Sequence, residues 1–450
     1  MRCRSKLAEY LSMLARASVL TNGLGRLRLI THHRAVEPQS RAAGDLRTLC
    51  LCIGIQMPSS RHIARVIGTC FLINLIEGYD TAAPGVAAPR LMPSLGIGTQ
   101  AMGVVFSAGM LGMLFGTLLG GSLADRLGRK PVLIAAVALL GVSTLVTSFV
   151  HGFLELATMR LAAGVAIGGA LPSLIALTSE TAPGQWRVTL VTIIFMGFPL
   201  GGMLVAVVGA VGVPHFGWPL IFQIGGIAPL LVSPLAFLML IESRRSHDRD
   251  SPRIPLRTLF SGELRLATPL LCFACALTLI AFYLLMNWLP AILVGKGFRA
   301  DFAPWAALAF SFGNLVSAGT VGLLIDRFGM RWPAVGLYLL LAADLLALAW
   351  ATRISEVLGL AFGAGYFAIG AQLSIYGITP AYYPRKMRAT GISVVLGAGR
   401  LGSVFGPLIA GYLMGIGFSG ASVVRLMAVA IPIAALAIYA LPPPPAYAET

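Results

Sequence analysis

Long apolar segments dominate this chain and set the strongest limit on its fold. A transmembrane helix needs about 20 mainly apolar residues, and twelve such segments follow residue 66. They lie at roughly 68–88, 100–122, 131–150, 154–178, 188–209, 219–241, 266–288, 304–325, 333–352, 358–379, 390–413 and 422–441. Inside lipid, backbone groups must hydrogen-bond within the protein, so each segment is expected to be a helix. The sequence therefore predicts an all-α membrane protein with twelve transmembrane helices.

Composition excludes several other classes of protein. Only 11% of the residues are charged and 57% are hydrophobic, whereas soluble domains carry about 25% charged residues. An enzyme is not expected, because no nucleophile, base and orienting group occur together. Histidines and cysteines lack metal-ligand spacing, so neither a metal nor a cofactor is expected. Cys272 and Cys275 form a C-x-x-C inside an apolar segment, where they are interpreted as small apolar residues rather than a redox pair.

The net charge of +16 invites a nucleic-acid interpretation, but its distribution argues against one. Residues 1–65 hold eleven Lys or Arg and three acids, so they supply 11 − 3 = +8 of the total. This basic extension contains no membrane span. It is interpreted as disordered or as a start placed too far upstream, with Met57 as a candidate first residue; an organellar targeting peptide is the alternative.

One polar stretch divides the apolar part of the chain in two. Residues 242–265 separate a six-span half at 66–241 from a second at 266–441, and a short tail covers 442–450. Most Lys and Arg residues of the loops lie on the same side of the membrane as this linker. The loops on the opposite side carry only Arg90, Lys296, Arg299 and Arg353. The positive-inside rule therefore places the linker and both termini in the cytoplasm, with the protein in the inner membrane.

The two halves are also related by an internal repeat. "GSLADRLGRK" begins at Gly121 and "GLLIDRFGMR" at Gly322, an offset of 201 residues. The same offset relates further pairs: Pro89 and Pro290, Gly96 and Gly297, Pro183 and Pro384, Arg187 and Arg388, Gly201 and Gly402. Since each half has six spans, both enter the membrane from the same side. Parallel repeats that meet around a midplane site are typical of secondary transporters.

The "GSLADRLGRK" loop, with its weaker second copy, resembles the signature loop of the major facilitator superfamily. Other motifs resemble the aromatic acid:proton symporter family within it: "EGYDT", "RLAAGVAIGGALP", "TSETAP", "FMGFPLGG", "NWLP", "YYPRKMRATG" and "GAGRLGSVFGP". The resemblance implies the major facilitator fold, and it implies a monomer that imports a small aromatic carboxylate of the benzoate or hydroxybenzoate class with protons. A drug:proton antiporter, and a porter of a sugar or another organic acid, are the alternatives.

Two acids lie within the first apolar segment. Glu77 and Asp80 are three residues apart, so they share a helix face, and charge at this depth costs at least about 2.5–3.5 kcal/mol. Burial raises the pKa of a carboxyl group and a nearby cation lowers it, so such a site is able to bind and release protons. We predict that both acids couple transport to protons, and the family resemblance implies the same. The alternative is a structural acid satisfied by neighbouring groups.

Two arginines lie within later segments, Arg160 in the fourth and Arg400 in the eleventh. A guanidinium group stays charged and binds a carboxylate through two hydrogen bonds. Both are therefore predicted substrate ligands, and Arg400 is expected to bind the substrate carboxylate. "GAGRLG" around Arg400 matches G-x-G-x-x-G, but a dinucleotide site needs a strand before it, so its glycines are assigned to helix packing.

Aromatic and amide side chains are candidates for contact with a planar ring. The predicted set is Tyr79, Trp288 and Gln372, and Tyr283, Asn287, Phe310, Tyr366 and Tyr376 are further candidates. Such residues also fill helix interfaces, which is the alternative for each of them. The acid Asp344, in the ninth segment, is left without a role by the sequence.

The charged signature loops are predicted to control which side of the transporter is open. This gating set is Asp125, Arg126, Gly128, Arg129, Lys130, Glu180, Asp326, Arg327, Arg331 and Arg388. In the family, such loops pair with helix ends at the cytoplasmic side. The alternative is that the charges are merely solvated or serve as positive-inside anchors.

Overall fold

The computed structural model describes residues 60–181, 187–240, 256–262, 264–384 and 387–443. The chain divides into two units, 1–63 and 64–450, and the architecture below is that of the second. Predictions for residues 1–59, for most of the 242–265 linker and for the end of the 442–450 tail lie outside the described residues.

All transmembrane elements are helices, and they form twelve successive spans. In chain order these are α3 (Ser60–Leu95), α4 (Thr99–Leu127), α5 (Arg129–Thr147), α6 (Phe153–Thr181), a fifth span built from α7 (Arg187–Phe195), α8 (Gly197–Val207), the π-helical η2 (Val208–Gly212) and α9 (Val213–Phe216), then α10 (Pro219–Met239), α11 (Leu264–Gly295), α12 (Ala303–Phe328), α13 (Arg331–Trp350), α14 (Ile354–Tyr382), α15 (Arg388–Gly415) and α16 (Gly420–Tyr439). The 3₁₀ turn η3 (Leu256–Phe260) precedes α11. The predicted all-α membrane fold with twelve helices is confirmed.

Eleven of these spans, within the part of the chain that the structure describes, are long and apolar enough to cross a membrane. The remaining span is α3, the first in chain order, which has 36 residues. Its polar residues Asn74, Glu77 and Asp80 are all buried in the protein. The helix that is least suited to lipid is therefore the one that carries the predicted proton-coupling acids.

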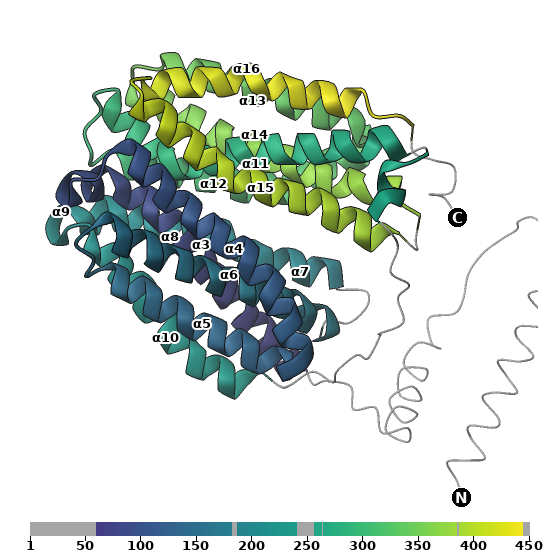
Figure 1. Cartoon of the computed structure of the whole chain (residues 1–450), viewed down its shortest axis with the longest axis horizontal. Coiled ribbons are helices and arrows are strands. Elements are labelled where there is room, and N and C mark those ends of the chain that lie inside the picture. Colours follow the sequence, from purple (N-terminus) through teal and green to yellow (C-terminus); the bar gives the residue numbers. More distant parts are fainter. Residues whose placement is uncertain (1–59, 182–186, 241–255, 263, 385–386, 444–450) are drawn as a thin grey trace, which may run out of the picture. The chain divides into compact units, whose positions relative to one another are not determined.

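The helices gather into two bundles, one from each half of the chain (Figure 1). In the N-terminal half α6 packs on α4 and α5, and α5 packs on α10. In the C-terminal half α14 packs on α12 and α13, and α13 packs on α16. Since α6 and α14 are the fourth span of their halves, the two bundles use the same packing plan.

Close helix contacts repeat between the halves at the offset of 201 residues. A Cβ added to Gly112 would lie 2.2 Å from the carbonyl oxygen of Leu161, and one added to Gly313 would lie 2.1 Å from that of Phe362. In the same way Gly201 faces the carbonyl oxygen of Leu75 and Gly402 faces that of Ala276. Both residues of each contact in the first half, shifted by 201, give the contact in the second half. The sequence repeat is therefore also a repeat of backbone contacts.

The loops obey the same symmetry. Gly128 and Gly329, which end α4 and α12, have φ values of 104° and 76°. Gly96 and Gly297, which follow α3 and α11, have φ values of 62° and 93°. A positive φ is strained for a residue with a side chain, so glycine at these helix ends lets the chain reverse direction sharply.

The helix termini gather at two opposite ends of the bundle, here called the Gly96 end and the Arg129 end. The Gly96 end contains Gly96, Thr99, Phe216, Gly297 and Gly417, and the Arg129 end contains Arg129, Thr181, Arg331 and Arg388. Helices of the two halves approach closely at the Gly96 end, where Gly103 lies against Gly411 and Gly209 against Pro304. The described contacts between the halves continue from there to mid-depth, where Arg400 touches Met113.

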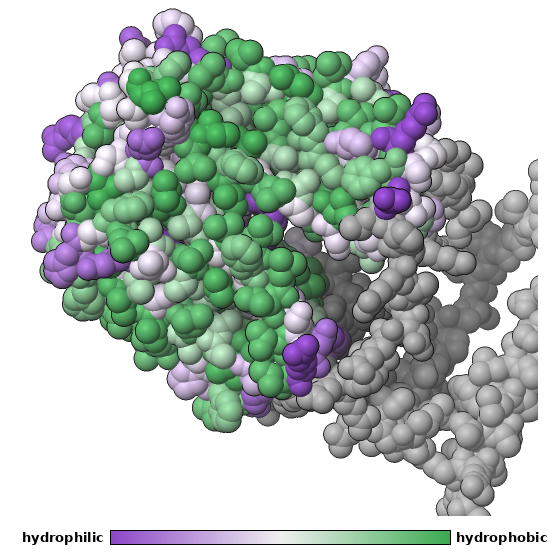
Figure 2. Space-filling view, in the orientation of Figure 1, coloured by the Kyte–Doolittle hydropathy of each residue, from purple (hydrophilic) through white to green (hydrophobic). Residues whose placement is uncertain are grey.

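The outer surface suits a bilayer. Figure 2 shows mainly apolar residues over the middle of this face and polar residues gathered toward its two ends. Large side chains such as Leu118, Leu154, Leu231 and Val429 are exposed there or elsewhere on the bundle. A contiguous apolar surface of this extent is typical of contact with lipid.

Candidate functional site

The centre of the N-terminal half contains a buried ion pair. Arg160 Nη1 lies 3.1 Å from Asp80 Oδ1 and 3.3 Å from Oδ2, and both side chains are only 3% exposed. Asp80 comes from α3 and Arg160 from α6, so the pair joins the first and fourth spans. Because each charge neutralises the other, burial of both is tolerated.

Hydroxyl groups from α5 complete this pair. Thr144 Oγ1 donates to Asp80 Oδ1 at 2.5 Å, and Arg160 Nη2 donates to Thr147 Oγ1 at 2.8 Å. The guanidinium group also lies over the ring of Phe222 from α10, 5.2 Å from its centroid. Four helices of one half therefore hold the pair in a fixed arrangement.

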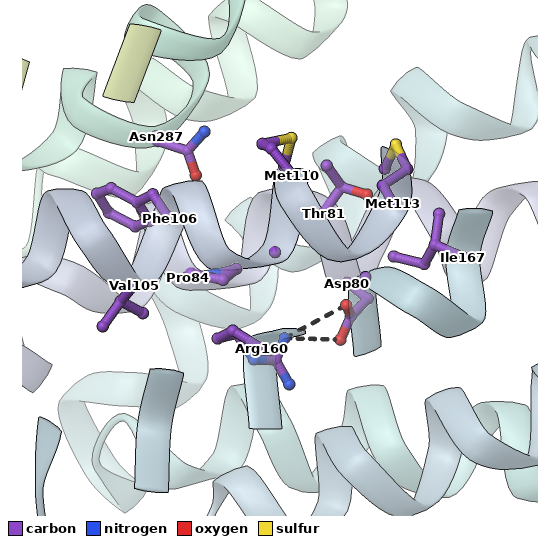
Figure 3. A pocket seen from close by; sticks show the side chains of 12 residues that line it. Asp80, Thr81, Pro84, Val105, Phe106, Met110, Met113, Arg160, Ile167 and Asn287 are labelled. Carbon is purple, nitrogen blue, oxygen red and sulfur yellow. Dashed lines mark hydrogen bonds and ion pairs between the residues drawn. The ribbon is translucent and has the colours of Figure 1, made fainter. Parts of the chain in front are cut away.

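A pocket opens beside the ion pair (Figure 3). In this conformation the pocket is narrow, with room for about one water molecule. Its lining is Asp80, Thr81, Pro84, Val105, Phe106, Gly109, Met110, Met113, Arg160, Gly164, Ile167 and Asn287. All but Asn287 belong to the N-terminal half, and Asn287 on α11 closes the pocket from the other half. One ion pair within mainly apolar walls suits a small molecule that combines an apolar body with a charged group.

Glu77 lies one helical turn from Asp80 but has different surroundings. Its side chain is buried, and Oε1 has no hydrogen-bond partner among the described residues. The charged group that acts on it is Arg400, from the C-terminal half. The two acids of α3 therefore face cations from different halves.

Arg400 does not line the pocket of Asp80 and Arg160. Its Nη1 contacts Met113 Sδ, and Met113 is part of the pocket wall. Arg400 thus contacts a residue of the pocket wall without lining the pocket itself. The two predicted cationic ligands are present at mid-depth, but the structure brings only Arg160 to this pocket.

The three predicted ring-contact residues lie in different places. Tyr79 packs against α10, where its hydroxyl donates to the carbonyl oxygen of Ile221 at 3.0 Å. Trp288 is fully buried, and its Nε1 donates to the carbonyl oxygen of Pro407 at 3.0 Å. Its ring meets Phe106 edge-on, with centroids 5.0 Å apart. Neither Tyr79 nor Trp288 lines the pocket, although Trp288 supports it through Phe106.

Gln372 belongs to a polar cluster in the C-terminal half. Its Nε2 lies 3.6 Å from Cys275 Sγ, and its Oε1 has no hydrogen-bond partner among the described residues. Tyr376, one turn further along α14, interacts with Gln372 and with the charge of Arg400. None of the three residues Gln372, Cys275 and Tyr376 lines the pocket around Asp80.

The predicted gating residues lie at the Arg129 end of the bundle. Arg129 forms an ion pair with Glu180, and Lys130 Nζ lies 4.7 Å from the ring centroid of Phe237. In the second half, Arg331 donates to the carbonyl oxygens of Tyr439 and Leu441. These contacts each join helices of the same half.

The remaining members of this set have more open surroundings. Asp125, Arg126, Asp326 and Arg327 are exposed, and Gly128 is the buried turn residue between α4 and α5. Arg388 begins α15, and its Nε has no hydrogen-bond partner in the part of the chain that the structure describes.

An ion pair at the Gly96 end was not predicted. Arg90, near the end of α3, contacts Asp301, which precedes α12, and thereby links the two halves. Arg299 also binds Asp301, at 3.1 Å. Hydrogen bonds lower the pKa of Asp301 below its usual range; the bond from Arg299 contributes most, followed by the bond from Arg90. The sequence placed these arginines outside the cytoplasmic set, but no local pattern relates residue 90 to residue 301.

Other residues of the site were also missed. Thr144, Thr147, Phe222 and Met113 were not singled out, since small hydroxyl and apolar residues are common in membrane helices. The only signal toward them was the need of a buried Asp and a buried Arg for partners.

Comparison with known proteins agrees with this architecture. The family model described as Major Facilitator Superfamily matches residues 70–304 and 271–450. Among solved structures, a D-xylose-proton symporter superposes with a TM-score of 0.70 at 18% identity, covering 85% of this chain and 98% of that one. A bacterial homologue of the human lysosomal transporter Spinster also gives 0.70 at 18% identity, covering 85% and 97%.

Curated relatives are more similar in sequence. The chain is 39% identical over 383 residues to the 3-(3-hydroxy-phenyl)propionate transporter of Escherichia coli (strain K12), covering 85% of this chain and 95% of the relative. It is 34% identical to the gallate transporter of Pseudomonas putida, covering 83% and 91%. It is 33% identical to the 4-hydroxybenzoate transporter of Pseudomonas aeruginosa, covering 85% and 93%.

Proposed function

We propose that this chain, which belongs to the Major Facilitator Superfamily, is a monomeric secondary transporter that imports a small aromatic carboxylate together with protons across the inner membrane. The observation that carries the proposal is the buried Asp80–Arg160 pair in the wall of a small apolar pocket. Three relatives named as transporters of aromatic acids support the substrate class.

The pocket chemistry fits an aromatic carboxylate. Phe106, Met110 and Ile167 offer apolar and polarizable surface to a ring. Arg160 offers a planar guanidinium group, which binds a carboxylate through two parallel hydrogen bonds. The ligand therefore needs an anionic end and a flat apolar body.

The ion pair supplies a reason for coupling to protons. While Asp80 is ionised, it occupies Arg160, and a second carboxylate nearby would be repelled. Once Asp80 is protonated, Arg160 is left as an uncompensated cation at membrane depth, which is costly. A substrate carboxylate then takes the place of the Asp80 charge. Substrate binding is thus favoured only when a proton is bound.

Glu77 and Arg400 are proposed as a second, related pair. Glu77 is buried in the N-terminal half and Arg400 comes from the C-terminal half. Because the halves rock against each other in alternating access, the distance between these charges changes with the state of the transporter. In this proposal Arg160 is the carboxylate ligand and Arg400 is the partner of Glu77. The prediction that Arg400 binds the substrate carboxylate is the alternative.

Orientation follows from the charges at the ends of the bundle. The Arg129 end carries Arg126, Arg129, Lys130 and Arg331, so we place it in the cytoplasm. Because α3 begins and α16 ends at this end of the bundle, we propose that both termini are cytoplasmic. Since the halves meet at the Gly96 end, the conformation described corresponds to a transporter closed toward the outside.

The gating role of the signature loops is retained in this proposal. Asp125 and its neighbours lie at the cytoplasmic end, where closure would bring the halves together. In this proposal the contacts of Arg129 with Glu180 and of Arg331 with Tyr439 of α16 keep each half rigid during that movement. The contact between Arg90 and Asp301 stabilises closure at the opposite end.

Uptake measurements test the function directly. Cells or vesicles containing the protein should accumulate labelled 4-hydroxybenzoate, benzoate, protocatechuate or 3-(3-hydroxyphenyl)propionate, and an uncoupler should abolish accumulation. Matched vesicles with the Asp80→Asn variant serve as the control. Uptake of a hexose in place of aromatic acids, or proton-driven export of a cationic drug, would overturn the proposal.

A further inference from the structure

We infer that Asn287 is a specificity-determining residue that accepts a hydrogen bond from a ring hydroxyl group remote from the substrate carboxylate. This inference rests on the proposed function. It assigns a polar recognition element to the wall of the pocket that faces Arg160.

The Asn287 amide has a fixed orientation. Its side chain is 1% exposed, and Nδ2 donates to the carbonyl oxygen of Tyr283 at 2.8 Å, one turn back along α11. This bond uses one N–H of Nδ2 and fixes which way the amide is turned, so that the acceptor Oδ1 lies on the opposite side from Tyr283. Figure 3 shows this oxygen pointing toward the pocket and the nitrogen pointing away from it. Among the described residues the amide of Asn287 makes only the hydrogen bond to Tyr283, so Oδ1 is open to a donor that enters the pocket.

Neighbouring contacts hold Asn287 in place. The next residue, Trp288, is anchored to Pro407 on α15 and to the ring of Phe106. On the other side, Gly85 of α3 allows the α11 backbone to come close, since a Cβ there would lie 2.6 Å from the carbonyl oxygen of Met286. The acceptor therefore lies on a helix at the interface between the two halves.

The position of Asn287 selects which hydroxyl group is recognised. Figure 3 places Arg160 and Asn287 on opposite sides of the pocket, with Phe106 along the wall between them. A carboxylate on Arg160 directs the ring toward Asn287, so a hydroxyl at the meta or para position is able to reach Oδ1. An ortho hydroxyl stays beside the carboxylate. An acid without a hydroxyl makes no hydrogen bond to this acceptor and so loses the contribution of that bond.

The wild-type protein gives the first test. Apparent KM values for uptake are measured for benzoate, 2-hydroxybenzoate, 3-hydroxybenzoate and 4-hydroxybenzoate. We expect the better of the 3- and 4-hydroxy isomers to have a KM roughly three- to tenfold below those of benzoate and the 2-hydroxy isomer, the factor for one neutral hydrogen bond. Equal KM values for all four acids would overturn the inference while leaving the proposed function intact. Failure to transport any of them would count against the proposed function itself.

Variants give the second test. Asn287→Leu keeps the size of the side chain and removes the acceptor, and Asn287→Ala removes it without bulk. Each is expected to reduce the wild-type preference for the hydroxylated acid to near unity. Asn314→Leu is the matched control, because Asn314 is also a buried amide of the C-terminal half but does not line the pocket. A preference that survives in a folded Asn287 variant, or is lost equally in Asn314→Leu, would contradict the inference.

Discussion

Asp80 and Arg160 form a buried ion pair across α3 and α6, with Arg160 Nη1 lying 3.1 Å from Asp80 Oδ1. The pair forms part of the wall of a pocket that a residue of the other half closes. Removal of one partner from a buried pair typically costs about 3–5 kcal/mol, because the other charge remains. Variants at these positions therefore need a check of folding beside each measurement of transport.

Asp80→Asn should abolish accumulation of substrate. Asparagine still accepts a hydrogen bond from Thr144, but it does not exchange a proton, so the coupling step is lost. We expect uptake against a gradient to fall to background while the protein still reaches the membrane. Asp344→Asn is the matched control, since Asp344 is an acid of a membrane helix that does not line the pocket. Accumulation by Asp80→Asn at the wild-type level would contradict the coupling role.

The two arginines should separate binding from coupling. Arg160→Lys keeps the charge but loses the planar pair of donors, so affinity for the aromatic acid should fall by tenfold or more. Arg400→Lys should bind the acid nearly as the wild type does and should lose part of the proton-driven accumulation. Affinity is measured on purified protein by calorimetry, and accumulation is measured in vesicles. Loss of affinity only in Arg400→Lys would instead support the sequence-based assignment of the carboxylate to Arg400.

Asp125→Asn should slow transport more than it weakens binding. Asp125 is exposed at the Arg129 end, remote from the pocket, so its charge affects the populations of the facing states and not the ligand contacts. We expect a reduced maximal uptake rate with a nearly unchanged affinity in calorimetry. Glu155→Gln, an exposed acid at the Gly96 end, serves as the control. A normal rate in Asp125→Asn would argue against gating by this loop.

Asp301→Asn should shift the transporter away from the conformation that is closed at the Gly96 end. The effect should be small, because Arg90 and Asp301 are more than one third exposed and exposed ion pairs contribute little. The pKa of Asp301 is lowered by Arg299 and Arg90, so the contact persists at neutral and mildly acidic pH and is lost only as the pH falls through that lowered pKa. Accessibility of a cysteine placed at the Gly96 end measures the shift. The exchange of both charges, Arg90→Asp with Asp301→Arg, should restore wild-type accessibility; no restoration would show that the contact is incidental.

Equivalent glycines should be equally sensitive in the two halves. Gly112→Ala and Gly313→Ala each force a Cβ against a carbonyl oxygen of the neighbouring helix. We expect each to lower the stability by about 1–3 kcal/mol, the usual cost of overpacking. Gly121→Ala and Gly322→Ala, which are related by the same offset and meet open space, are the matched controls. Thermal unfolding in detergent gives the comparison. Equal melting temperatures for all four variants would show that these contacts are not tight.

Sequence reasoning found the charged residues of the membrane core but not how they pair. Glu77 and Asp80 stand out because acids are rare in apolar helices, and Arg160 and Arg400 stand out for the same reason. Nothing in the spacing of these four residues says which acid meets which arginine. In the structure Asp80 forms an ion pair with Arg160 of the same half, and the charge of Arg400 from the other half acts on Glu77. The aromatic candidates show the same limit, since Trp288 and Tyr79 proved to be buried in helix contacts.

The sequence alone determined the elements of this protein: twelve helices, two halves and the residues too polar for lipid. These follow from local composition and from a constant offset of 201 residues, both of which are properties of the chain and not of its packing. The tertiary structure alone decided the site. The pocket, the hydroxyl partners of the ion pair and the inward-pointing Asn287 acceptor depend on how helices distant in sequence approach one another. That approach is set by side-chain volume and by glycine contacts, such as Gly85 against α11, which act between segments and leave no periodic signal in either one.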